Sequence, residues 1–119
     1  MKTEIFNMNN NGDINEFEFH IGQNKSENFD VIDLGMENDL WFHAEDTPSC
    51  HVVVNLNEIK LSKKEKNLII KKGALLCKEN TNSLINKKNV GILYTKIKNI
   101  EKTNRIGTVL TKETKVIHI

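Results

Sequence analysis

Proline, cysteine and large aromatic residues are scarce in this sequence of 119 residues, which contains one proline, two cysteines, one tryptophan and one tyrosine. Cys50 and Cys77 show no CxxC spacing, so the chain lacks a disulfide framework and the usual ligand pattern of structural zinc. We expect two free thiols and no metal or other cofactor. Internal repeats and low-complexity tracts are also missing, and the length corresponds to about one domain over residues 1–119.

Long apolar runs are absent as well. No stretch approaches the ~20 apolar residues of a membrane-spanning helix, and the N-terminus lacks the charged-then-apolar pattern of a signal peptide. The apolar residues that are present cluster in periodic segments, which predicts a folded chain rather than a disordered one. The sequence therefore predicts a cytosolic or nuclear protein without membrane contact, and we expect it in the cytoplasm.

Basic residues are nearly absent from the first half of the chain. Residues 1–59 hold 2 lysines against 12 Asp and Glu, whereas residues 60–119 hold 15 Lys and Arg against 4 Glu. In one fold these charges could neutralise each other, or they could sort onto different faces and leave a basic surface for phosphate. A solvated, lysine-rich helix is the simpler alternative.

Turn residues and alternating polarity predict the first elements. Strands are expected over 2–8 and about 17–21, joined into a β-hairpin by the Asn-rich turn at 9–13. Asn24, with Glu27 three residues later, is typical of a helix N-cap, and Gly35 suits the position after a helix end, so a short helix is expected over 25–34. Strands over 39–44 and 51–55 follow.

The second half begins with the longest predicted element. Ser62 and Glu65 form a capping-box pattern, and apolar residues at helical spacing continue to about Glu79. The apolar run at 90–94 predicts a strand buried on both faces, and short edge strands are expected over 97–100, 105–110 and 115–119. The predicted fold class is α+β, with a mixed, largely antiparallel β-sheet, one long and one short helix, and two layers.

The strand at 39–44 carries unusual side chains. With a period of two, Asp39, Trp41 and His43 share one face. If this strand pairs with the next one so that His43 lies opposite His51, the same face gains a second imidazole. Such a face suits nucleic acid, because an indole can stack on a base. Alternatively, Trp41 is a core residue and His43 a satisfied buried histidine.

Catalytic motifs do not accompany these side chains. Asp39 and His43 share a face, but no nucleophile pattern, metal motif or phosphate-binding loop stands beside them. Cys50, His43 and His51 lack the spacing of a zinc site. We therefore expect a binding protein rather than an enzyme.

Several separate motifs resemble the NFACT-R domain family. They are Gly22–Asn28, the Asp-x-Trp-x-His pattern at 39–43, Pro48–Val52, Tyr94 and Thr95 with Lys98 and Lys102, and Gly107–Val109. This family is the predicted RNA-binding domain of ribosome-quality-control factors that recruit tRNA to tail stalled chains, and it also occurs in smaller eukaryotic proteins with a coiled coil. The resemblance covers nearly the whole chain but not the tRNA-engaging, helix-hairpin-helix or coiled-coil regions of the large factors. It implies a stand-alone module without tailing activity.

The resemblance implies binding to structured RNA, such as tRNA or rRNA, in translation or ribosome quality control, with DNA as another ligand. The expected contact residues are Asp39, Trp41, His43, His51, Lys98, Lys102 and Arg105. In this interpretation Trp41 and His43 stack on a nucleotide, Asp39 orients His43 or accepts from a base amino group, and the cations bind phosphates.

A second candidate site lies at the start of the short helix. Its residues are Gly22, Gln23, Asn24, Lys25 and Asn28. A glycine that opens into a helix N-terminus presents free N–H groups, which suits an anion. The alternative function for the whole chain is a protein-interaction module that docks on ribosomal or quality-control proteins without contacting nucleic acid.

Overall fold

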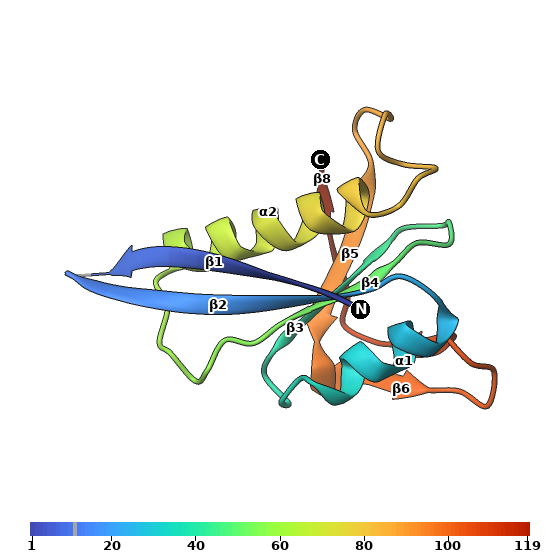
Figure 1. Ribbon diagram of the computed structural model, residues 1–119, viewed down its shortest axis with the longest axis horizontal. Helices are drawn as coiled ribbons and strands as arrows, with labels where there is room; N and C mark the ends of the chain where they lie inside the picture. The colour runs from blue at the N-terminus through green and yellow to red at the C-terminus, as the bar shows by residue number, and fades with distance from the viewer. Residues whose placement is uncertain (11) are drawn as a thin grey trace.

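Six antiparallel strands and two helices make up most of the computed structural model, which describes residues 1–10 and 12–119 (Figure 1). The sheet has the order β1-β2-β4-β3-β5-β8, and all five of its pairings are antiparallel. Its strands are β1 (Lys2–Asn10), β2 (Asp13–Gly22), β3 (Leu40–Ala44), β4 (His51–Val54), β5 (Gly91–Lys96) and β8 (Lys115–His118). The remaining elements are α1 (Lys25–Asp33), α2 (Lys63–Glu79), a 3-10 turn (Ile97–Asn99), and a separate two-stranded sheet of β6 (Ile100–Lys102) and β7 (Val109–Thr111). The predicted α+β class is confirmed.

The first two strands form the predicted hairpin, which projects to the left in Figure 1. Its register runs from Lys2 opposite Ile21 to Asn10 opposite Asp13. Phe17, Phe19 and Ile21 are buried on one face, as the alternation predicts. Asn11 of the predicted turn lies outside the described residues.

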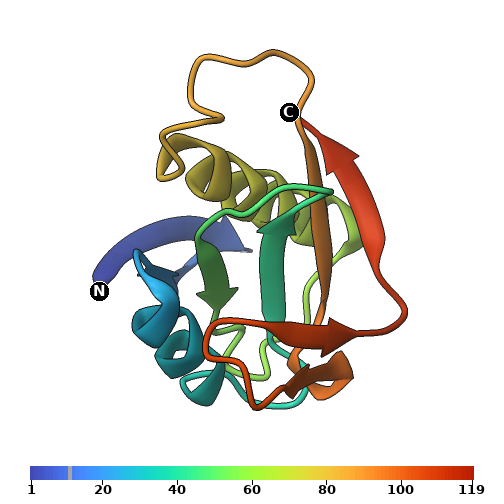
Figure 2. The same ribbon diagram turned by 90° about the vertical axis from the view of Figure 1, so that its right-hand side faces the viewer.

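The two helices cover opposite faces of the sheet (Figures 1 and 2). On one face, Leu40 and Phe42 of β3 pack in the same core cluster as Ile69 and Leu76 of α2. On the other face, Trp41 packs with Val31 and Ile32 of α1 and with Val109 of β7. The fold therefore has three layers rather than the predicted two. Nearly every side chain of β3 and β4 is buried, so both faces of these strands must be covered.

The long helix begins where the sequence predicts. The Ser62 side chain accepts from the Glu65 N–H, the Glu65 carboxylate accepts from the Ser62 N–H, and the helix ends at Glu79. Gly73 faces Phe42, where a Cβ would overlap the phenyl ring. This glycine therefore sets how closely α2 approaches β3.

The apolar run at 90–94 does not lie at the centre of the sheet. β5 has the edge strand β8 as one neighbour, and Leu93 and Tyr94 are only half-buried. The central positions belong to β3 and β4. The prediction of a strand buried on both faces was wrong for β5, because a short apolar run does not specify a strand's place in the sheet.

Candidate nucleic-acid interface

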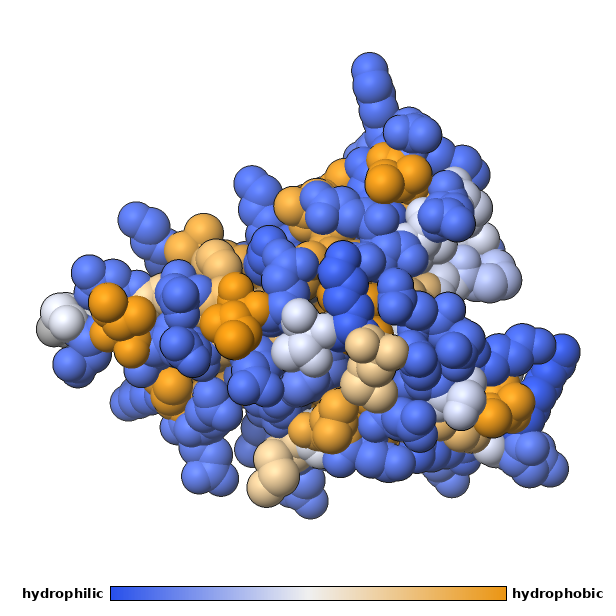
Figure 3. Space-filling view, in the orientation of Figure 1, coloured by the Kyte–Doolittle hydropathy of each residue, from blue (hydrophilic) through white to orange (hydrophobic). Residues whose placement is uncertain are grey.

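A depression of about 670 Å³ lies where β3 ends and β4 begins. The segments that meet there are the start of α1, the end of β3, the β3–β4 connection with the first residue of β4, the middle of β5, and the β6–β7 connection with β7. Figure 2 looks onto this end of the molecule, and Figure 3 shows the surface hollowed at the corresponding right-hand edge. We call this depression the histidine pocket; its lining consists of Lys25, Asn28, Trp41, His43, Ala44, Asp46, Thr47, Pro48, Ser49, His51, Leu93, Arg105, Ile106, Gly107, Thr108, Val109 and Thr111. Asp46 is the one carboxylate among them, and it is exposed.

Three rings form the floor of the histidine pocket. Trp41 stacks on His43 with 5.7 Å between ring centroids and an interplanar angle of 6°. His51 stands edge-on to His43, with centroids 4.9 Å apart. The Trp41–Val53 pairing matches the predicted register, and it brings His43 and His51 together as expected.

Trp41 supports the two imidazoles instead of offering a free surface. Only 2% of its area is exposed, and its Nε1 donates to Nδ1 of His51 at 3.1 Å. A nucleotide has no open indole face to stack on. The predicted stacking role of Trp41 is therefore wrong, and its contribution is to fix both histidine rings.

The hydrogen-bond partners of the two imidazoles indicate which ring nitrogen carries the proton in each. Nδ1 of His43 lies 2.7 Å from the Ala44 carbonyl oxygen, which only accepts, so Nδ1 carries the proton. Nδ1 of His51 accepts from Trp41, so in the neutral ring the proton lies on Nε2. Neutral His43 therefore keeps an acceptor at Nε2, and neutral His51 keeps a donor at Nε2.

Burial holds both rings neutral near pH 7. It lowers the pKa of His51 to about 3, with the nearby His43 charge adding to the effect. Burial also lowers the pKa of His43, although its hydrogen bond to the Ala44 carbonyl works in the opposite direction. The donor at one ring and the acceptor at the other thus coexist at physiological pH.

Two cations lie at the rim of the histidine pocket. Lys25 and Arg105 both line it and are both exposed. Gly107, at φ +80°, brings the β6–β7 connection against Lys25, and a Cβ there would lie 3.0 Å from the Lys25 Cβ. The two segments that carry the cations are thus held together at one side of the pocket.

Asn28 joins the first helix to the pocket floor. Its Oδ1 accepts from the His51 backbone N–H at 3.0 Å. Gly22 makes room for this contact, because a Cβ there would lie 2.6 Å from the same oxygen. The Gly22–Asn28 segment therefore positions α1 against the start of β4.

The expected anion corner is already satisfied by protein groups. The Gln23 N–H donates to Glu27 Oε1 at 3.1 Å, and the Glu27 N–H donates to the Asn24 side chain at 2.9 Å. A carboxylate thus occupies the helix start that an external anion would need. Of this corner, Lys25 and Asn28 line the histidine pocket, whereas Gly22, Gln23 and Asn24 do not.

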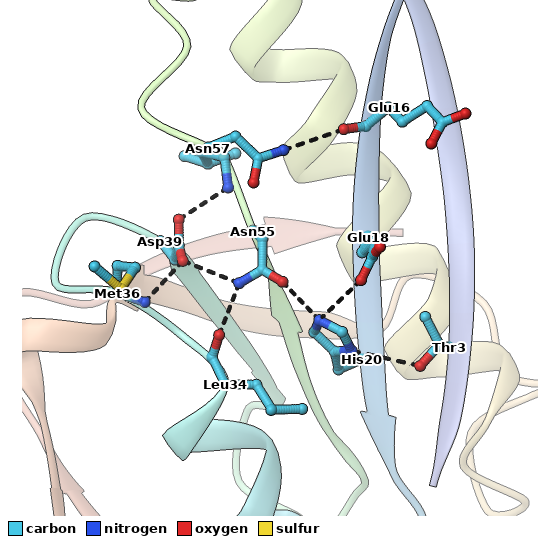
Figure 4. A network of polar contacts seen from close by, with 10 residues as sticks. Thr3, Glu16, Glu18, His20, Leu34, Met36, Asp39, Asn55 and Asn57 are labelled. Carbon is cyan, nitrogen blue, oxygen red and sulfur yellow. Dashed lines mark hydrogen bonds and ion pairs between the residues drawn. The ribbon is translucent and has the colours of Figure 1, made fainter.

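Asp39 lies at the other end of β3, away from the pocket, where it binds groups of the neighbouring loops (Figure 4). Its carboxylate accepts from the N–H groups of Met36 and Leu56, each at 2.8 Å, and from the Asn55 side chain at 3.1 Å. Asn55 in turn contacts His20 at 2.6 Å. With 4% of its area exposed, Asp39 ties loops together and does not orient His43.

The two predicted lysines also lie away from the pocket lining. Lys102 bonds both carboxylate oxygens of Asp33 at 2.8 Å and lies 5.2 Å from the Phe29 ring centroid, so it ties β6 to α1. Lys98 is exposed on the 3-10 turn. Arg105 alone of the three predicted phosphate ligands lines the pocket.

Reasoning from the sequence missed the two loops that complete the site. Pro48 and Ser49 of the β3–β4 connection and Ile106 and Thr108 of the β6–β7 connection all line the pocket. A signal was present, since Pro48–Val52 and Gly107–Val109 are among the motifs that carry the family resemblance. Their convergence could not be read from the sequence, because segments about 60 residues apart in the chain meet only through the tertiary fold.

Neither a cluster of metal-ligating side chains nor a membrane-spanning helix is found in the described part of the chain. Within residues 1–10 and 12–119, no group of three or more His, Cys, Asp or Glu side chains is arranged to hold a metal ion. Cys50 and Cys77 are buried free thiols. Neither described helix has the length and apolar character needed to cross a membrane.

Known proteins resemble this chain in sequence. A family model described as NFACT protein RNA binding domain matches residues 5–118. Coiled-coil domain-containing protein 25 from Bos taurus is 28% identical over 108 residues, covering 87% of this chain and 52% of that protein. Its Dictyostelium discoideum homolog is 32% identical over 88 residues, covering 74% of this chain and 43% of that protein. The chain spans about half the length of these relatives.

A solved structure has the same fold. It is the C-terminal part of the fibronectin/fibrinogen-binding protein from Streptococcus suis, with a TM-score of 0.72 and 22% sequence identity. The match covers 87% of this chain and 41% of that one. At this identity the likeness concerns the arrangement of helices and strands.

Proposed function

This chain belongs to the NFACT protein RNA-binding domain family, and from that premise we propose that it binds RNA through the histidine pocket and its cationic rim. The ligand is structured RNA, tRNA or rRNA, in translation or ribosome quality control. The protein acts in the cytoplasm as a binding module without catalysis. DNA is a second candidate ligand and should be tested beside RNA, because phosphate contacts alone do not distinguish the two nucleic acids.

The observation that carries this proposal is the convergence of four of the five family motifs on one pocket. Residues from Gly22–Asn28, the 39–43 pattern, Pro48–Val52 and Gly107–Val109 all line it. Structural packing alone would not require four separate motifs to surround an open depression of about 670 Å³. A shared ligand accounts for their common location.

The rim supplies the electrostatic part of binding. Lys25 and Arg105 are exposed beside the pocket, and no ion pair of either side chain is found within residues 1–10 and 12–119. Both are free to bind phosphate oxygens and release counterions from RNA. Lys102 contributes less in this account, because Asp33 holds it.

The test is an RNA titration followed by fluorescence anisotropy at several salt concentrations. The double variant Lys25→Gln/Arg105→Gln should bind more weakly. For this variant, the slope of log K against the logarithm of the salt concentration should be smaller in magnitude by about 1–2. The matched control is Lys87→Gln/Lys88→Gln, which removes two exposed charges outside the pocket. Equal losses in both variants would contradict a localised site.

The β6–β7 connection favours protein docking as the second candidate function. Ile106 lines the pocket and is 52% exposed, and Leu110 is 61% exposed. Exposed apolar side chains beside a pocket are typical of protein contacts. Salt-insensitive binding to purified ribosomal or quality-control proteins after nuclease treatment, without RNA affinity, would support this function over RNA binding.

A further inference from the structure

The floor of the histidine pocket differs chemically from its rim. The rim carries Lys25 and Arg105, whereas the floor consists of neutral rings from Trp41, His43 and His51. The volume of about 670 Å³ falls within the range of ~300–1,000 Å³ that is usual for small-ligand sites. Phosphate contacts at the rim would leave this floor unfilled.

Each floor imidazole uses one ring nitrogen within the protein. Nδ1 of His43 donates to the Ala44 carbonyl, and Nδ1 of His51 accepts from the Trp41 indole. Among the described residues, every fully buried side-chain nitrogen or oxygen has a hydrogen-bond partner. Neither Nε2 has a partner there, so each keeps some exposed area, and both rings line the pocket. His51 as a whole is only 2% exposed, so its Nε2 edge is the part that a ligand could reach, whereas the indole of Trp41 already uses its one polar atom.

The two remaining nitrogens have complementary polarity. Nε2 of His43 is an acceptor, and Nε2 of His51 is a donor. A phosphate in its ionised form only accepts hydrogen bonds, so it would face the lone pair of His43 without a proton to share. The floor therefore suits a flat group that places a donor beside an acceptor, and every nucleobase has this pattern on its Watson–Crick edge.

We propose that the histidine pocket holds one unpaired nucleobase, which donates to His43 and accepts from His51, while Lys25 and Arg105 bind the adjoining phosphates. This inference rests on the proposed RNA binding and adds the form of RNA that is recognised. A paired base has its Watson–Crick edge occupied and cannot enter, so the ligand carries a bulge, a loop or a single-stranded end. The arrangement is a site for one displaced nucleotide on a structured RNA.

The first experiment varies the RNA. Three hairpins of identical length and charge are titrated: one fully paired, one with a single bulged uridine, and one with an abasic nucleotide at the bulge. The bulged uridine should raise affinity about tenfold over the paired hairpin, which corresponds to ~1.4 kcal/mol. The abasic version should lose that gain, because the hydrogen bonds to the base edge are then absent. Methylation of uridine N3 should have the same effect as removing the base.

The second experiment varies the protein. In His43→Phe a ring remains to stack on Trp41, but the acceptor at Nε2 is gone. This variant should bind all three hairpins with the affinity of the paired one. The matched control is His118→Phe, an exposed position on β8 outside the pocket, which should bind as the natural sequence does. Circular dichroism and thermal unfolding confirm that each variant is folded.

The outcomes separate this inference from the proposed function. Preference for the bulged base that depends on N3 and on His43 supports a nucleobase site. Equal binding of all three hairpins, or full preference retained in His43→Phe, leaves RNA binding in place and overturns the nucleobase site. Failure of the unaltered protein to bind any of these hairpins or purified tRNA and rRNA overturns the proposed function and this inference with it.

Discussion

His51 combines surroundings that each oppose a positive charge on its ring. It is 2% exposed, its Nδ1 accepts a hydrogen bond from the Trp41 indole N–H, and the ring centroid of His43 lies 4.9 Å from its own. Burial, and to a smaller extent the nearby charge of His43, lowers the pKa of His51 to about 3. In the unfolded chain the ring has an ordinary pKa of about 6.5, so between these values the unfolded state binds more protons than the folded one.

Acidification should therefore destabilise the protein through His51. The contribution is complete above about pH 6.5 and declines as the pH falls towards 3. Urea unfolding at pH 7 and pH 4.5 should show a loss of roughly 3 kcal/mol from this ring, which is absent in His51→Gln. His43 adds a loss of the same sign, since its pKa is also lowered. An equal pH dependence in His51→Gln and the unaltered protein would contradict this assignment.

Asp39 should matter for folding and not for RNA. Its carboxylate accepts three hydrogen bonds, from Met36, Leu56 and Asn55. Asp39→Ala leaves buried donors without a partner and should lower the free energy of unfolding by about 2–4 kcal/mol. Under conditions where the variant is folded, its RNA affinity should equal that of the unaltered protein. A selective loss of affinity would place Asp39 back in the binding site.

Among the elements, α2 is the one whose ends and packing follow most directly from the sequence. Its capping box and the periodic apolar residues predict Lys63–Glu79, and the helix has these bounds. The sequence does not predict which face of the sheet it covers. That depends on β3 and β4, whose alternate residues meet different helices.

Gly73 provides a test of this helix–sheet contact. By helix propensity, Gly73→Ala should stabilise α2 by about 1 kcal/mol. We predict the opposite, a loss of about 1–3 kcal/mol, because the added Cβ would overlap the buried Phe42 ring. Thermal unfolding measures the change. Asn67→Ala, at an exposed position of the same helix, is the control and should stabilise by a few tenths of a kcal/mol.

For the histidine pocket, the sequence predicts several of the residues but not how the fold arranges them. Alternation and the Trp41–Val53 register correctly bring His43 and His51 together. Alternation cannot show whether a face is open to solvent. It therefore predicts that Trp41 and Asp39 lie on the contact surface, although both are buried. The sequence gives no sign that Lys102 has a partner within the protein. Its ion pair with Asp33 arises from the tertiary packing of β6 on α1.

Across the whole molecule, the acidic and basic halves of the sequence meet and partly neutralise each other. Lys72 of α2 pairs with Glu4 of β1, and Lys102 pairs with Asp33. Lys25 is one of only two lysines in the acidic half, and the fold places it beside Arg105 from the basic half. The cationic rim is therefore a product of the tertiary fold rather than of a local basic run.

The most direct measurement for this account is an amide chemical-shift map of the isotope-labelled protein during titration with a bulged RNA hairpin. The largest changes should fall at the start of α1, on the β3–β4 connection and on Arg105–Val109. The indole and imidazole signals of Trp41, His43 and His51 should change with them. Changes confined to the exposed lysines of α2, with the histidine pocket unaffected, would contradict the central claim.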